Sequence, residues 1–277
     1  MKKNFNKRLI IAFLTVAAVC SLCACSKNSP DAGVIVREAE SNAEKMESCK
    51  AEYRRSLSFS ADGKKYECDA SSNISYTAKP FALESVETSA DGGSKSENES
   101  YTVTSGGKLW YYCKSGSTWQ KTEAADLNTS PLEQIDALRL LKSAGSYKFV
   151  RETAYGSQNA DKIEAKFKNE ILRSTIEDIT GKTGMAANSK TIVQTLIDGA
   201  PDIYGYIYVN KGTGNIIHIE ADVTDAVNSI FKNIDGSDVK INVGKCEITG
   251  GITDIGKKNG ISLPADAESA ADVQAYG

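Results

Sequence analysis

The chain has 277 residues, enough for one large domain or two small ones. It holds 33 basic and 36 acidic residues, but residues 1–24 contain four of the basic ones and none of the acidic ones. Residues 25–277 therefore carry 29 basic against 36 acidic residues, a net charge of −7. Such a balance argues against a nucleic-acid partner and against electrostatic attraction to anionic lipid headgroups.

Residues 1–24 have the pattern of a bacterial lipoprotein signal peptide. A basic start is followed by an apolar run over residues 9–19, which is shorter than the roughly 20 residues of a transmembrane helix. Leu22-Cys23-Ala24-Cys25 then resembles the lipobox, which implies cleavage before Cys25 and a diacylglyceryl group on its sulfur. The alternative is an ordinary secretory signal with a chance cysteine. We expect the lipid on Cys25 to hold the protein on the extracytoplasmic face of the cell membrane.

The first predicted elements are a helix and a hairpin. Residues 25–31 form a polar tether, residues 32–277 are expected to fold as one domain, and near-helical apolar spacing predicts a helix over 31–50. Alternation over residues 51–59 predicts a strand, and Asp62-Gly63 is a favoured hairpin turn. Centring the hairpin there pairs Leu57 with Cys68, Tyr53 with Ser72 and Phe59 with Tyr66.

Residues 62–121 read as a meander of strands, because turn signals recur at near-regular spacing. Ser130-Pro131-Leu132-Glu133 follows as a helix start with a capping box, and the helix is expected to run to residue 144. Strands are predicted over 146–155, 161–168, 203–210, 215–221 and 239–249, and helices over 169–180, 189–198 and 223–231. Residues 261–264 are expected to form a short closing strand and residues 265–277 a frayed tail.

Four cysteines remain after the signal and Cys25 are set aside: Cys49, Cys68, Cys113 and Cys246. An even count in an exported protein is compatible with two disulfides, for which three pairings exist. Buried free thiols are the alternative.

Motifs for common catalytic chemistry are missing. The chain has no Cys-x-x-Cys, P-loop, EF-hand loop or nucleophile elbow, and its one histidine, His218, lies between Ile217 and Ile219 of a predicted strand. We therefore expect no enzyme activity, no metal and no cofactor, with His218 in a structural role. A cell-envelope hydrolase that uses two scattered carboxylates is a competing class.

The order of elements resembles the LolA/LolB/LppX-like lipoproteins, and in particular a Gram-positive lipoprotein group of unknown function. The resemblance rests on the lipobox, the early hairpin, Lys79-Pro80, the aromatic strands at residues 99–101, 108–112 and 117–121, and the closing residues 261–264. It implies an α+β fold in which a strongly curved antiparallel half-barrel sheet is covered by several helices around an apolar cavity for acyl chains.

We therefore expect the concave face of the sheet to bind a lipid, a glycolipid or another apolar ligand, with the helix at residues 130–144 as a lid. A structural or adhesive surface lipoprotein without a ligand is the alternative, and it predicts a filled interior. The residues expected to line the cavity are Leu57, Phe59, Tyr66, Ile74, Tyr76, Leu83, Trp110, Tyr112 and Trp119.

Overall fold

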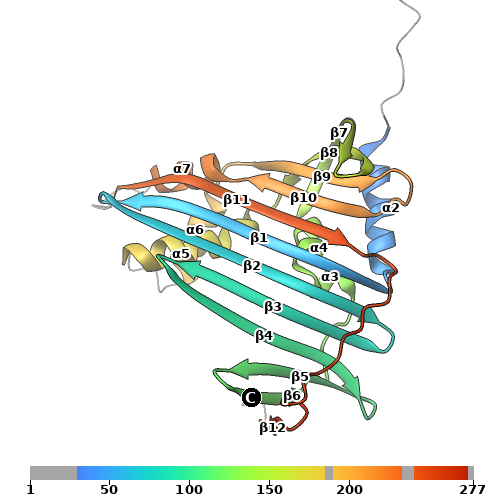
Figure 1. Ribbon diagram of the computed structural model, residues 1–277. Helices are drawn as coiled ribbons and strands as arrows, with labels where there is room; N and C mark the ends of the chain where they lie inside the picture. The colour runs from blue at the N-terminus through green and yellow to red at the C-terminus, as the bar shows by residue number, and fades with distance from the viewer. Residues whose placement is uncertain (1–29, 185–189, 233–239, 274–277) are drawn as a thin grey trace, which may run out of the picture. The chain divides into compact units, whose positions relative to one another are not determined.

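A computed structural model describes residues 30–184, 190–232 and 240–273. The elements below belong to one compact unit, Ala32–Gly277 (Figure 1). Its strands are β1 Ser48–Ala61, β2 Lys64–Ala78, β3 Phe81–Asp91, β4 Ser94–Ser105, β5 Lys108–Ser115, β6 Thr118–Glu123, β7 Ala144–Tyr155, β8 Gln158–Phe167, β9 Ile203–Asn210, β10 Ile216–Asp222, β11 Ile241–Thr253 and β12 Ala271–Asp272.

The helices lie together on one face of the sheet (Figure 1). They are α2 Ala32–Glu44, α3 Pro131–Gln134, α4 Asp136–Lys142, the 3₁₀ turn η1 Asn169–Leu172, α5 Arg173–Thr183, α6 Lys190–Asp198 and α7 Thr224–Lys232.

All of these strands form one open sheet, in the order β12-β6-β5-β4-β3-β2-β1-β11-β10-β9-β8-β7. Neighbouring strands are antiparallel except β12 and β6, which are parallel. The sheet is curved and twisted, and the helices cover one of its faces (Figure 1). The predicted fold class, an antiparallel sheet covered by helices, is thereby confirmed.

The predicted hairpin register is also confirmed. Leu57 pairs with Cys68, Tyr53 with Ser72 and Phe59 with Tyr66. Asp62 and Gly63 both have positive φ, 51° and 80°, as the tight turn between two twisted strands requires.

The two faces of the sheet can be followed from this register, because residues that pair directly point to the same side. Leu57, Cys68 and Cys246 form one row across β2, β1 and β11. Arg55, on the same side of β1, forms an ion pair with Asp178 of α5, so this side is the one that the helices cover. We call it the inner face and the opposite side the outer face.

The inner face and the helices enclose one large apolar core. Leu172, Ile176 and Ile179 of η1 and α5 are fully buried, as the predicted spacing requires. The hairpin of β9 and β10 and the helix α7 likewise fall where the sequence predicts them. Residue 239, the predicted start of β11, lies outside the described residues.

Two predicted helices have different limits in the structure. The first ends at Glu44 rather than at residue 50, and Ser48–Lys50 already belong to β1. The reason is that Cys49 and Ala51 extend the alternating buried face of β1. The second is divided into α3 and α4 at Ile135, which is extended and fully buried, and the side chain of Ser130 caps nothing.

The C-terminal predictions are wrong. Residues 261–264 are not a strand, and residues up to 273 are ordered against the sheet. Ala267 and Ala270 pack on Trp119, while Ala271–Asp272 pair with β6. Burial of these two alanines in the cluster around Trp119, far away in the sequence, holds the C-terminal segment on the sheet. The segment is otherwise polar, so its sequence does not indicate this contact. Residues 274–277 lie outside the described part of the chain.

Candidate functional site

The nine residues expected to line one cavity lie on two faces of the sheet. The register that pairs Leu83 with Thr102 and Thr102 with Tyr111 puts Tyr111 on the inner face, so its neighbour Tyr112 points outward. The prediction of a single lining surface is therefore wrong. Inner-face members are Leu57, Phe59, Tyr66, Ile74, Tyr76 and Leu83, and outer-face members are Trp110, Tyr112 and Trp119.

The inner-face group is part of the main core. Each of the six is less than a tenth exposed except Tyr66, which is half-buried. Tyr66 stacks on Phe59 with 4.8 Å between ring centroids. The hydroxyl of Tyr76 donates to the Thr129 carbonyl oxygen at 3.1 Å, and burial raises the pKa of Tyr76 to about 12. These side chains make an apolar layer that the helices cover.

Helix α4 lies directly on the backbone of β11 near the centre of this layer. A methyl group added to Gly250 would stand 2.8 Å from Ala137 Cβ of α4. Leu132 of α3 and Leu138 and Leu141 of α4 are buried in the core between these helices and the sheet. The segment that was expected to act as a lid therefore covers the inner face, in contact with it at a glycine.

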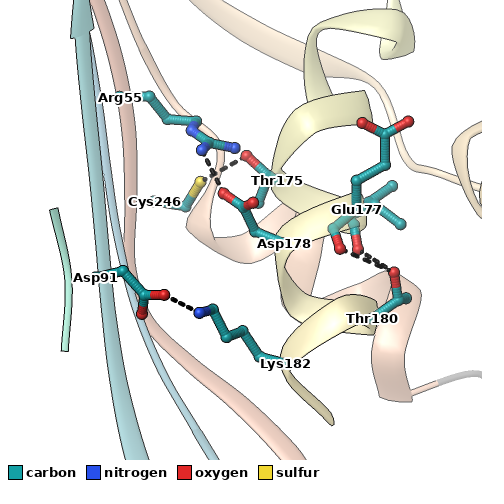
Figure 2. A network of polar contacts seen from close by, with 9 residues as sticks. Arg55, Asp91, Thr175, Glu177, Asp178, Thr180, Lys182 and Cys246 are labelled. Atoms are coloured by element: carbon teal, nitrogen blue, oxygen red, sulfur yellow. Dashed lines mark hydrogen bonds and ion pairs between the residues drawn. The ribbon is translucent and has the colours of Figure 1, made fainter. Parts of the chain in front are cut away.

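A polar cluster interrupts the apolar layer beneath α5 (Figure 2). The Arg55 side chain is 8% exposed and its Nη2 bonds to Asp178 Oδ2 of α5. Thr175 Oγ1, one turn earlier on α5, lies 3.5 Å from Cys246 Sγ. Burial raises the pKa of Cys246 to about 11, so its thiol is neutral at pH 7.

Two polar atoms at this place have no partner. Arg55 Nη1 and Ser72 Oγ are buried and make no hydrogen bond. Arg55 pairs with Ala70, two residues along β2 from Ser72, so both side chains stand on the inner face as diagonal neighbours. Leaving a buried donor without a partner costs about 1–3 kcal/mol of stability. The unpartnered groups of Arg55 and Ser72 therefore need a physical explanation.

The prediction of disulfides is contradicted. Cys49, Cys68, Cys113 and Cys246 are all free thiols. Cys68 and Cys246 are separated by β1 within one row, about 10 Å at the usual strand spacing. Cysteines can bridge only when their Cα atoms are within about 7 Å. The thiols instead fill the inner side of the sheet as small side chains.

The outer-face group forms a separate cluster at the β6 end of the sheet. Trp119 is 3% exposed and lies 5.7 Å from Tyr101, measured between ring centroids. Ala267 and Ala270 of the C-terminal segment cover it, with Trp110 at its margin. The role of this cluster is to fix the end of the chain on the sheet.

His218 lies on the outer face of β10 in a packed set of rings. Its ring stacks on Tyr155 at 4.5 Å, and Nε2 lies 3.5 Å from Glu220 Oε2. Burial lowers the pKa of His218 more than the Glu220 carboxylate raises it. The imidazole is therefore neutral at pH 7, in surroundings that fit a structural residue.

Two carboxylates meet at one tyrosine on the outer face, which is the arrangement closest to the hydrolase alternative. The Tyr101 hydroxyl donates to Glu99 Oε1 at 2.8 Å, and Glu84 Oε1 is 3.3 Å from the same oxygen. A pair for glycoside cleavage must flank a substrate cleft, whereas these two carboxylates both contact the hydroxyl of Tyr101. Among the described residues no group of three or more His, Cys, Asp or Glu side chains is arranged to hold a metal ion.

A solvent-open hollow of about 580 Å³ lies away from all of these groups. It is bounded by the turn between α4 and β7 and by the end of β8, and its lining includes Lys166, Asn169 and Asp202. None of the nine expected lining residues borders it. Its size would suit a small ligand, but its mixed polar lining does not suit an acyl chain.

Cys25 and the signal lie outside the described residues. In the part of the chain that is described, no helix is long and apolar enough to cross a bilayer.

Comparisons with known proteins give structural neighbours only. No protein-family model matches the chain, and no curated protein matches it in sequence. It is similar in fold to lipoprotein LppX of Mycobacterium tuberculosis, with a TM-score of 0.40, 10% identity and coverage of 83% of this chain and 97% of that one. For LprF from Mycobacterium bovis the TM-score is 0.42 and the identity 11%, with coverage of 86% of this chain and 98% of that one. For a LolA superfamily protein from Nitrosomonas europaea the TM-score is 0.25 and the identity 11%, with coverage of 84% of this chain and 94% of that one.

Proposed function

We propose that the protein is a lipoprotein, anchored through Cys25 on the extracytoplasmic face of the cell membrane, that binds an elongated apolar molecule between the inner face and the helices. The inner face is filled by its own side chains and by the helices, so a ligand could enter only if the helices move aside. The observation that supports the proposal most is the extent of the apolar layer that the helices cover, in which five of the six inner-face candidates are buried. Helices α3 and α4 take no part in the strand pairing, so their displacement would leave the sheet intact, at the cost of removing Leu138 and Leu141 from the core.

The energy of such binding suits a carrier. Each methylene removed from water contributes about 0.8 kcal/mol, so roughly ten of them offset the cost of association and of moving the helices, and leave a modest affinity. A carrier must also release its ligand, which a modest affinity permits.

Substitution of Gly250 by alanine tests whether the layer beneath α4 is the binding place. The new methyl would meet Ala137 at 2.8 Å, so we expect α4 to be displaced and stability to fall by about 1–3 kcal/mol. An uncharged fluorescent apolar probe, such as N-phenyl-1-naphthylamine, should then bind several times faster than to the wild type in stopped-flow measurements.

Gly251→Ala is the matched control. The next residue points to the outer face, and a methyl there has no atom within 4 Å, so its binding rate should equal that of the wild type. Equal rates in all three proteins would show that the probe does not enter beneath α4. Absence of binding in all three would favour the structural alternative, in which the core is permanently filled.

A further inference from the structure

We infer that the bound molecule is an acyl chain that ends in an anionic headgroup, a carboxylate or a phosphate, and that Arg55 and Ser72 hold this headgroup on the inner face. The inference rests on the proposed function, since it names the class of ligand and the place of its polar end.

Arg55 supplies the charge and the free donor. A guanidinium has five N–H donors in a planar fork suited to carboxylate and phosphate. Asp178 engages it through a single pair of atoms, Arg55 Nη2 and Asp178 Oδ2. Arg55 Nη1 remains buried without a partner in a side chain that is only 8% exposed. The fork is therefore only partly used by the protein itself.

Ser72 supplies a second unpartnered group on the neighbouring strand. Its hydroxyl is buried and makes no hydrogen bond. As a diagonal neighbour of Arg55 across β1 and β2, its Cα lies about 7–8 Å from that of Arg55. A group with several oxygen atoms that entered between the sheet and the helices could accept from both side chains at once.

Arg55 and Ser72 lie where the part of the sheet covered by α4 meets the part covered by α5. Helix α4 covers Gly250, which pairs with Tyr53 on one side of Arg55, and α5 carries Asp178 over Arg55 itself. Tyr53 is close enough to both Arg55 and Arg139 for each to lower its pKa against the larger effect of burial. Arg139, however, is exposed and ion-paired with Asp136 of its own helix, so Arg55 is the cation on which the site depends.

An acyl chain from this point would run along the apolar layer, while its headgroup stays near the open side. Apolar residues of the inner face flank the pair in both directions along the strands, Ile74 beyond Ser72 and Leu57 beyond Arg55. Glu87, which pairs with Ser72 across β3, is exposed, so solvent begins one strand away from the buried Ser72. The carboxylates of Asp178 and Glu87 oppose an anion there, and Asp178 competes with it for Arg55.

The rival explanation is that the ion pair only fastens α5 to the sheet. The two explanations predict different changes in ligand affinity for the variant Asp178→Asn. A fastening role predicts that this variant is less stable and binds no differently. A competing role predicts that it binds an anionic ligand more tightly, because Arg55 is released for the ligand.

The experiment measures the affinity of a fluorescent polyene fatty acid and of its methyl ester, which has the same tail and no charge, in the full-length protein. In the wild type the acid should bind more tightly than the ester. Arg55→Gln should lower the affinity for the acid about tenfold or more. Ser72→Ala should lower this affinity by a smaller factor, and Asp178→Asn should raise it. The ester should be unaffected by all three.

Ser71→Ala is the matched control, since the Ser71 hydroxyl bonds to Thr88 rather than standing unpartnered on the inner face. It should leave both affinities unchanged. If Arg55→Gln fails to fold, Asp178→Asn and Ser72→Ala still decide the question, because the first is isosteric and the second removes no hydrogen bond.

The outcomes separate the two proposals. Acid and ester affinities that are equal and insensitive to these variants would overturn the headgroup site while leaving apolar binding intact. Failure of both probes to bind would overturn the proposed function itself. Displacement of the acid by millimolar inorganic phosphate would show a site for a free anion, which contradicts an acyl-chain ligand.

Discussion

Gly205→Ala is expected to destabilise the protein by about 3 kcal/mol or more, a large part of the total stability of an ordinary domain. Gly205 lies in β9, where an added Cβ would stand 2.3 Å from the Glu220 carbonyl oxygen, 2.9 Å from the Phe167 ring and 3.0 Å from Ala221 Cα. Two of these atoms belong to the backbone of β10 and cannot turn aside. Relief of the overlap therefore requires β9 and β10 to separate, which breaks the sheet.

Urea unfolding of Gly205→Ala beside Gly251→Ala measures this effect. Both glycines lie within strands of the same sheet, but a methyl at Gly251 meets nothing within 4 Å. The midpoint should fall sharply for the first and little for the second. Equal midpoints would mean that β9 and β10 do not approach each other as closely as the structure has them.

Cys25→Ala is expected to abolish lipid attachment completely, since the resemblance to the lipobox places the diacylglyceryl group on the Cys25 sulfur and removes Cys23 with the signal. One acyl chain gives marginal membrane binding and two give a stable anchor. In cells fed an alkyne-labelled fatty acid, the wild type should carry the label and enter the detergent-rich phase of Triton X-114. The variant should carry no label.

Cys23→Ala is the matched control for the anchor, because Cys23 belongs to the same tetrapeptide but is expected to leave with the signal. It should be labelled as strongly as the wild type. Label on Cys25→Ala, or loss of label from Cys23→Ala, would contradict Cys25 as the attachment point.

The strand order near the start of the sheet could be predicted because its turn is specified locally. Asp62-Gly63 fixes both the loop length and the pairing of Leu57 with Cys68, and the alternation on β1 then tells which side is buried. The same alternation contained the signal for Arg55, which shares the odd-numbered side with Leu57 and Phe59. A charge on an apolar side of a strand marks a place to look for a partner, and sequence reasoning overlooked it.

The division of the aromatic residues between two faces could not be predicted from their clustering alone. Which face a residue takes after several hairpins depends on the number of residues in each turn, and a change of one reverses it. Trp110, Tyr112 and Trp119 are aromatic and near Tyr76 in sequence, but neither property determines the face on which they lie. The C-terminal contact with Trp119 was hidden for a different reason, since alanines in a polar tail carry no periodic signal.

The measurement that tests the central claim most directly is mass spectrometry of the protein purified from the membranes of its own host. A denatured spectrum gives the mass with the covalent lipid on Cys25, and a native spectrum of the same sample adds any molecule held without a covalent bond. We predict that the native mass exceeds the denatured mass by that of an amphiphile with an acidic headgroup, and that this excess is lost on denaturation. Identical native and denatured masses would contradict the account and favour a surface lipoprotein whose core is filled by its own side chains.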